Sequence, residues 1–92
     1  MDKILIITPV YNKEEFLQNS IESILQQSHE NVELIIIDDC STDRSLEIAQ
    51  SYEHLDNVTV LKNKENKGCY YSRNKGLNYF KNKEWDYFTI HD

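Results

Sequence analysis

The sequence is poor in glycine and cysteine, and each shortage excludes a class of site. Only two of its 92 residues are glycine, and the loop-like stretch "TPVYN" has none. A dinucleotide-binding fingerprint needs glycines in such a loop so that the backbone can approach a pyrophosphate. The two cysteines, Cys40 and Cys69, do not have the spacing of a disulfide framework or a zinc site. We therefore expect a reducing, cytoplasmic environment and no backbone cradle for phosphates.

Long apolar runs and positive charge are also scarce. No apolar run approaches the ~20 residues that span a bilayer, and the chain does not open like a secretory signal. Acidic residues outnumber basic ones by 16 to 10, a formal net charge of −6. Nucleic-acid-binding proteins usually carry a basic patch, so we expect no nucleic-acid partner and no membrane segment. A phosphate-bearing ligand would need a divalent cation as mediator, and a parent protein could be peripheral at the inner face of the membrane.

What the sequence does contain is a regular alternation of apolar runs and helix-like segments. The runs that predict buried strands are "KILIITPV", "VELIII", "NVTVLKN" and "WDYFTI". Asn12 with Glu15 three residues later has the pattern of a capping box and predicts a helix that begins at Asn12. Gly68 predicts the turn into a third helix. The order predicts an α/β fold: one domain over residues 1–92, with about four mostly parallel strands and helices on both faces in three doubly wound layers.

Ligands of such sheets bind outside the carboxyl ends of the strands. This rule selects four segments as candidates for the site. They are Thr8 to Asn12, Asp38 to Asp43, Lys62 to Arg73, and the pair His91 and Asp92. The other histidines, His29 and His54, lie among polar residues and are expected at the surface.

The adjacent carboxylates Asp38 and Asp39 have two interpretations. An aspartate after a strand often accepts hydrogen bonds from the backbone of the following loop or helix, and this suits Asp38. Successive strand residues point to opposite faces, so only one of the two can face a ligand. We favour Asp39 for that role, as an acceptor for a ribose hydroxyl or for the N–H of a pyrimidine ring.

Three further side chains are candidates, each with a structural alternative. Tyr11 could stack on a base or pack on the neighbouring helix. Arg73 could pair with phosphate or stack on a planar ring, although a lone arginine on a helix is often merely solvated. Asp92 could contribute an oxygen ligand to a divalent cation, but one carboxylate does not make a metal site.

Three stretches together, "ITPVYNKEEFLQNSIESILQQS", "ELIIIDDCSTDRS" and "ENKGCYYSRNKGL", resemble the N-terminal half of a family 2 glycosyltransferase. The resemblance covers nearly the whole chain, in order. It implies the Rossmann-like GT-A fold, truncated here to its nucleotide-binding half. It also implies transfer of a sugar from a nucleotide-sugar, often a UDP-sugar, to a glycan or other hydroxyl acceptor, usually with inversion and with Mg²⁺ or Mn²⁺.

The resemblance also implies roles for individual residues. Thr8, Pro9, Val10 and Tyr11 would form the wall of the nucleoside pocket, and Asp39 would accept the N–H of a uracil ring. Arg73 would lie near the base or the phosphates. Asp92 would be the first aspartate of the D-x-D cluster that contacts ribose and holds the metal. The general base of the family would lie beyond this chain, so we assign no catalytic residue and expect neither transfer nor tight metal binding by the chain alone.

Three other interpretations remain. A phosphoacceptor receiver domain has its acidic pair after the first strand and its phosphorylated aspartate after the third, which this sequence does not match. A dinucleotide-binding fragment would need the missing glycine loop. A folding or interaction unit is the third, because a sheet with an open edge favours self-association.

Overall fold

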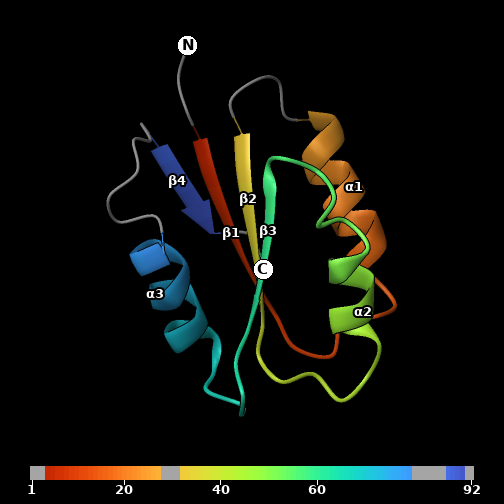
Figure 1. Ribbon diagram of the computed structural model, residues 1–92, viewed down its shortest axis with the longest axis vertical. Helices are drawn as coiled ribbons and strands as arrows, with labels where there is room; N and C mark the ends of the chain where they lie inside the picture. Colours follow the sequence, from red (N-terminus) through yellow and green to blue (C-terminus); the bar gives the residue numbers. More distant parts are fainter. Residues whose placement is uncertain (1–3, 28–31, 80–86, 91–92) are drawn as a thin grey trace.

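The computed structural model describes residues 4–27, 32–79 and 87–90. Four strands and three helices alternate along the chain (Figure 1), as the sequence predicts. They are β1 (Ile4–Val10), α1 (Leu17–Gln27), β2 (Val32–Asp38), α2 (Ser45–Gln50), β3 (Val58–Lys62), α3 (Cys69–Tyr79) and β4 (Tyr87–Ile90).

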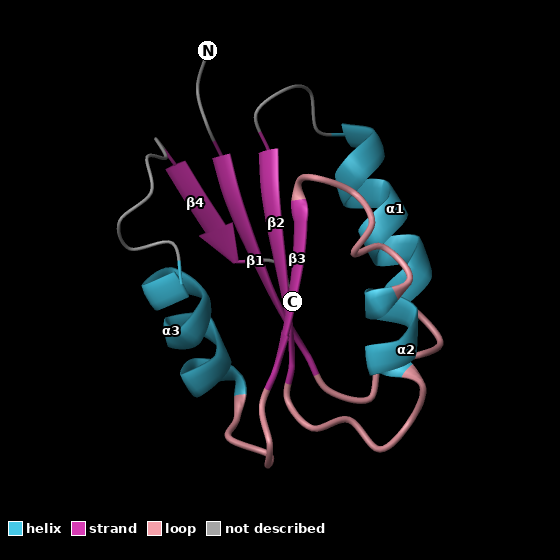
Figure 2. Ribbon diagram, viewed as in Figure 1, coloured by secondary structure: helices cyan, strands magenta, loops and turns pink. Residues whose placement is uncertain are grey.

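The strands form one parallel sheet in the order β3-β2-β1-β4. Helices α1 and α2 cover one face of the sheet and α3 covers the other (Figure 2), which confirms the three-layer architecture. The loops that follow β1, β2 and β3 gather at the same end of the sheet, where its carboxyl ends meet. The topology therefore brings three of the four predicted segments together.

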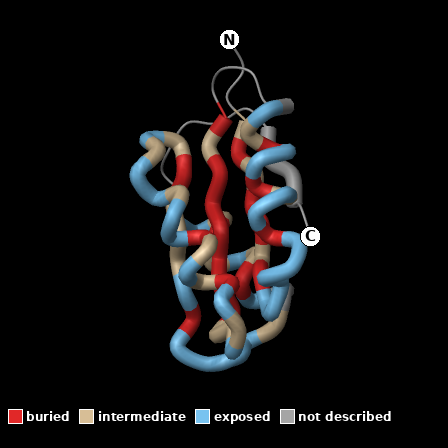
Figure 3. The backbone as a smooth tube through the Cα atoms, turned by 90° about the vertical axis from the view of Figure 1, so that its right-hand side faces the viewer, coloured by how far each residue is buried: buried red, intermediate tan, exposed pale blue. Residues whose placement is uncertain are grey.

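Burial follows from the alternation of side chains along the strands. On the face covered by α1 and α2, Leu34 and Ile36 pack with Leu17, Ile21 and other apolar residues. The four residues Leu34 to Ile37 have no exposed surface, so β2 is buried on both faces. This is the environment expected of a central strand in a doubly wound sheet. Figure 3 shows the buried residues concentrated along the strands, with the outer sides of the helices exposed.

The face covered by α3 is built differently, because small residues bring this helix close to the sheet. Ser72 and Gly76, one turn apart on α3, are both buried. A Cβ atom on Gly76 would lie 2.9 Å from both Ile7 Cγ2 and Ile37 Cδ1, so the position accepts glycine because the helix approaches β1 and β2 closely. Leu5, Ile7, Ile35 and Ile37 form the core on this face.

The predicted start of the first helix is wrong. The helix begins at Leu17 and not at Asn12, and a turn occupies residues 14–16. Asn12 has a left-handed backbone conformation, with φ of 51°, which a helix cap does not have. Its side chain binds another loop, so a hydrogen bond between distant segments replaces the local capping box.

Candidate functional site

The loops after β1 and β2 are joined by hydrogen bonds in both directions. Asn12 Oδ1 accepts from the backbone N–H of Thr42 at 2.8 Å and of Asp43 at 3.3 Å, and the N–H of Asn12 donates to Ser41 Oγ at 3.0 Å. The N–H of Lys13 likewise donates to Ser45 Oγ at 2.7 Å. We call these two segments, residues 11–16 and 39–45, the loop pair. Its bonds fix the backbone that carries Tyr11.

Asp43 completes the loop pair from the other side. Its carboxylate accepts from the N–H of Glu14 at 3.1 Å and from the N–H of Ser45, the first residue of α2, at 2.8 Å. Burial acts to raise the pKa of Asp43, but hydrogen bonds from Ser45 and from the N–H of Glu14 bring it below the usual value. Asp43 is thus an ionised structural carboxylate.

The two adjacent carboxylates point to opposite faces of the sheet. Asp38 accepts from both the N–H and the hydroxyl of Ser41, at 3.0 and 2.5 Å, which is the loop-capping role expected for it. Asp39 lies on the α3 side, and its own N–H donates to the carbonyl of Val10 at 2.8 Å. That bond places Asp39 beside the exit of β1, where Tyr11 follows with 43% of its surface exposed.

The Asp39 carboxylate is buried, with 4% of the residue exposed, and it binds the segment between β3 and α3. Its Oδ1 accepts from Asn63 Nδ2 at 2.8 Å and from the N–H of Lys67 at 2.7 Å, and its Oδ2 accepts from the N–H of Gly68 at 2.7 Å. Gly68 has φ of +91°, a conformation that glycine adopts without strain. This confirms the predicted turn into the third helix.

Hydrogen bonding also sets the charge state of Asp39. Burial acts to raise its pKa, whereas the N–H of Lys67, the amide of Asn63 and the N–H of Gly68 lower it. The net result is a pKa below the ordinary value for aspartate. Near neutral pH, Asp39 is therefore a carboxylate that accepts hydrogen bonds and donates none.

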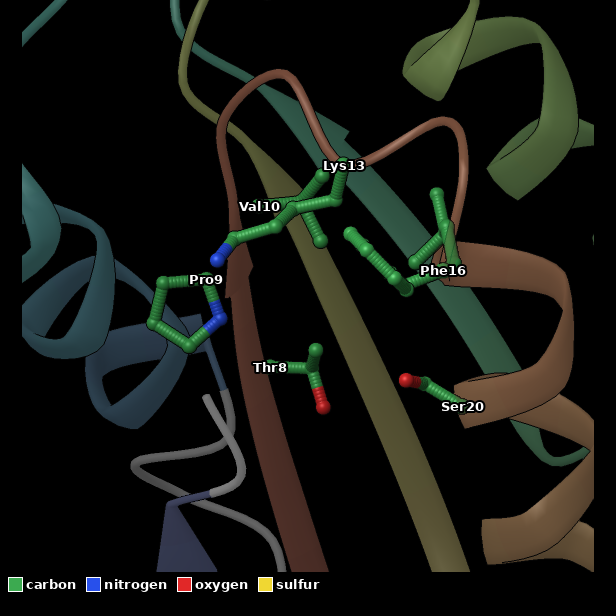
Figure 4. Close-up of a pocket in the computed structure, with 7 residues that line it drawn as sticks. Thr8, Pro9, Val10, Lys13, Phe16 and Ser20 are labelled. Carbon is green, nitrogen blue, oxygen red and sulfur yellow. The ribbon is translucent and has the colours of Figure 1, made fainter.

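The predicted wall of the nucleoside pocket is divided by the sheet. Thr8, Pro9 and Val10 line a hollow of about 230 Å³ between β1 and α1, together with Lys13, Phe16, Leu17 and Ser20 (Figure 4). Thr8 Oγ1 is buried there and has no hydrogen-bond partner among the residues that the structure describes. Neither Tyr11 nor Asp39 lines this hollow. The structure thus brings Asp39 and the start of α3 together, and places Thr8 on the opposite face.

Of the remaining candidates, Arg73 lies on α3 and Asp92 follows β4. Arg73 is half-buried on this helix, one residue after Ser72. Asp92, His91 and His29 lie outside the described residues, whereas His54 is exposed, as expected. Within residues 4–27, 32–79 and 87–90, no three His, Cys, Asp or Glu side chains are grouped to hold a metal ion.

Comparison with known proteins decides the family. Residues 5–92 match the sequence profile described as Glycosyl transferase family 2. The chain belongs to glycosyl transferase family 2. This confirms the family that the three sequence stretches resemble. It excludes a receiver domain and a dinucleotide-binding fragment.

Curated relatives of this family 2 chain are named as glycosyltransferases. It is 43% identical over 71 residues to a putative teichuronic acid biosynthesis glycosyltransferase of Bacillus subtilis, covering 76% of the chain and 28% of that protein. It is 38% identical over 72 residues to the glycosyltransferase GlyA of Streptococcus pneumoniae, covering 78% of the chain and 10% of that protein. The chain thus spans about a quarter or less of the length of these relatives.

Solved structures show that the family 2 chain has the GT-A fold. TarS of S. aureus (residues 1–349) in complex with UDP superposes with a TM-score of 0.84 at 29% identity, over 98% of this chain and 27% of that one. The same protein in complex with UDP-GlcNAc gives 0.82 at 28% identity, over 98% and 26%. A mannosyltransferase from Pyrobaculum calidifontis, in complex with GDP-Man and Mn²⁺, shares the fold at 20% identity, with a TM-score of 0.76 over 84% and 24%.

None of the described helices of the family 2 chain is long and apolar enough to cross a membrane. Sequence reasoning included Asn63 and Ser72 only as part of the segment Lys62 to Arg73, without a role for either, and it missed Lys75. They form one chain of hydrogen bonds behind Asp39: Asn63 Nδ2 donates to Ser72 Oγ at 2.9 Å, and Lys75 Nζ donates to Asn63 Oδ1 at 2.9 Å. Their spacing of three and nine residues has no motif. A polar residue directly after a buried strand, like Asn63, was the one available signal.

Proposed function

We propose that this chain forms the nucleotide-binding part of a glycosyltransferase that uses a UDP-sugar as donor. In the complete enzyme, the sugar is transferred to a hydroxyl group of a glycan or another acceptor, with inversion at the anomeric carbon. The relatives named as glycosyltransferases support the reaction class. TarS, which was solved with UDP and with UDP-GlcNAc, supports the choice of donor.

The observation that carries the proposal is the state of the Asp39 carboxylate. It is ionised, it lies at the carboxyl end of β2, and the bond between its N–H and the Val10 carbonyl sets it next to Tyr11. A carboxylate can accept about four hydrogen bonds, and the described residues supply three of them. Counting the described residues alone, one acceptor position remains for the N–H of a uracil ring, and the exposed Tyr11 supplies a stacking surface beside it.

The other binding residues follow from the same pose. Pro9 contributes to the rim of the hollow beside α1, but its side chain alternates with those of Thr8 and Val10 along β1. We therefore place that side chain on the α3 face with Asp39, where it would border the base. We propose that Arg73, on the second turn of α3, approaches the base or the phosphates from that face. Thr8 and Val10 support the wall from behind, through the hollow that they share with α1.

A divalent cation fits the chemistry of a diphosphate leaving group but does not fit the described residues as a complete site. The mannosyltransferase neighbour was solved with Mn²⁺, and Mg²⁺ or Mn²⁺ would offset the charge on the departing diphosphate. Asp92, which follows β4 and lies outside the described residues, is the carboxylate that we propose as one ligand. Among residues 4–27, 32–79 and 87–90 there is no cluster that could complete the set, so we expect no tight metal binding by this chain alone.

We place the transfer step in the longer enzyme. Inverting transfer needs a general base against the acceptor hydroxyl, and we assign that role to no residue of this chain. Since the chain corresponds to 28% of the teichuronic acid relative, acceptor binding and the base belong to the rest of such an enzyme.

The test is a titration of the ¹⁵N-labelled chain with UDP, 3-methyl-UDP and ADP in the presence of Mg²⁺, followed by NMR chemical shifts. We expect UDP to shift the amides of Tyr11, Asp39 and Arg73. ADP should not, and neither should 3-methyl-UDP, which lacks the ring N–H. No response to UDP, or equal responses to all three ligands, would refute the proposal.

Self-association is the competing proposal, because the sheet order leaves β3 and β4 at its two edges. An edge strand can pair with another chain. Analytical ultracentrifugation separates the two cases: a chain that forms stable oligomers and gives no UDP response is an interaction unit, and a monomer that responds to UDP is the nucleotide-binding part proposed above.

A further inference from the structure

Asn63 lies immediately after β3 and is 5% exposed, and its amide group is held from both sides. Both amide protons are used: Nδ2 donates to Asp39 Oδ1 at 2.8 Å and to Ser72 Oγ at 2.9 Å. The amide oxygen accepts from Lys75 Nζ at 2.9 Å. Asn63 therefore connects a cation on α3 with the carboxylate at the end of β2.

Lys75 and Asp39 together fix which way the Asn63 amide points. An ammonium group can only donate hydrogen bonds, so the oxygen of the amide must face Lys75 and the NH₂ group must face Asp39. Lys75 Nζ is itself anchored, because it also donates to the carbonyl of Lys62 at 2.8 Å. Without Lys75, the amide oxygen would lose its partner, and only the bonds to Asp39 and Ser72 would hold the amide in place.

The bond from Asn63 limits the acceptor positions that Asp39 can offer to a ligand. Its Oδ1 accepts two hydrogen bonds, from Asn63 and from the N–H of Lys67, so this oxygen is filled. Its Oδ2 accepts one, from the N–H of Gly68. Within the part of the chain that the structure describes, the carboxylate thus keeps a single acceptor position, and that position is on Oδ2.

We propose that Asn63 is a specificity-determining residue for the nucleobase. By filling Oδ1 in an orientation fixed by Lys75, it restricts Asp39 to a base edge with one N–H donor, which is the edge of uracil. Guanine presents a ring N–H and an adjacent NH₂ group, and these match a carboxylate with both oxygens available. Cytosine presents a ring nitrogen lone pair, which the carboxylate repels. Guanine would be rejected because its NH₂ donor would be left unpaired, and cytosine because its ring nitrogen lone pair would face the carboxylate.

This inference rests on the proposed function and adds to it a residue that does not itself touch the nucleotide. The experiment compares the dissociation constants of UDP and GDP, measured by NMR titration of the 92-residue chain. The variants are Asn63→Ala, which frees one of the two acceptor positions of Oδ1, and Lys75→Met, which keeps Asn63 but removes the partner of its amide oxygen. Lys64→Met is the matched control, since Lys64 is exposed and adjacent to Asn63 in the sequence.

We expect the wild-type chain and Lys64→Met to prefer UDP over GDP to the same degree. In Asn63→Ala the ratio of the two dissociation constants should fall about tenfold, the effect of one hydrogen bond to a charged group. Lys75→Met should shift the ratio in the same direction by less. A merely structural role for Asn63 would weaken both nucleotides together and leave the ratio unchanged.

The outcomes separate this inference from the function on which it rests. A wild-type chain that binds UDP but has no preference over GDP, or a preference that survives both substitutions, overturns the role of Asn63 alone. A wild-type chain that does not bind UDP, or binds 3-methyl-UDP equally well, overturns the proposed function and this role with it. If Asn63→Ala does not fold, the ratio in Lys75→Met decides, because that variant retains every group around Asp39.

Discussion

Replacing Asn12 tests whether the loop pair depends on one side chain and one unusual backbone conformation. In Asn12→Ala, the alanine must keep φ near 51°, a left-handed conformation that costs about 1–2 kcal/mol. Unlike asparagine, alanine has no side-chain hydrogen bond that could offset this cost. The substitution also removes the acceptor for the N–H groups of Thr42 and Asp43. Because these groups are exposed to water, that loss costs only about 0.5–1.5 kcal/mol. The free energy of unfolding should therefore fall by about 2 kcal/mol.

The variant Asn12→Gly separates the two contributions. Glycine adopts the left-handed conformation freely, so it should lose only the hydrogen bonds and destabilise by about 0.5–1.5 kcal/mol. The assay is urea unfolding monitored by circular dichroism. The urea concentration at the transition midpoint should fall, while the dependence of the unfolding free energy on urea concentration stays unchanged. Asn74→Ala, at an exposed position of α3, is the control and should lie within about 0.5 kcal/mol of the wild type. The reasoning is refuted if the alanine variant is as stable as the glycine variant, or if both match the wild type.

Three further predictions concern the α3 face and the site. Gly76→Ala should lower the free energy of unfolding by about 1 kcal/mol, measured by thermal or urea unfolding. Overpacking costs about 1–3 kcal/mol, and the higher helix propensity of alanine offsets at most about 1 kcal/mol of that cost. A more stable variant would contradict the close approach to Ile7. Asp39→Asn should lower stability at pH 6. The folded-state pKa of Asp39 is lowered, so its contribution is fully present above the unfolded-state value of about 4 and is lost as the pH falls below that value through the folded-state pKa. The gap to the wild type should therefore narrow in acid, and a gap independent of pH would count against an ionised Asp39. Tyr11→Ala should weaken UDP binding about five- to hundredfold by loss of stacking, while urea unfolding stays near the wild-type value; unchanged affinity would remove Tyr11 from the site.

Most of the fold could be predicted from the sequence because its signals are local. Continuous apolar runs marked the strands, and Leu17, Ile21 and Ile24, on one face of the first helix, are all buried. The alternation of side chains also placed Asp38 and Asp39 on opposite faces of the sheet. The helix start at Asn12 failed because its side chain binds residues about 30 positions away, and a capping box is read within four residues.

The α3 face shows the same limit in another form. Its contact with the sheet uses Ser72 and Gly76, which carry no apolar signal, because small size and not hydrophobicity allows the close approach. The bonds from Asn63 to Asp39 and Lys75 join three elements through single atoms. Such contacts depend on the assembled sheet, so no periodic pattern in the sequence could reveal them.

The mutual bonds of the loop pair have a consequence for protein engineering. Surface loops usually accept insertions well, but here an added residue in either loop would move donors away from acceptors in the other. A peptide tag or an inserted domain belongs instead at the opposite end of the sheet, in the turn between α2 and β3 (Figure 1). There Glu53 and His54 are both exposed, and an insertion would leave the geometry around Tyr11 and Asp39 unchanged.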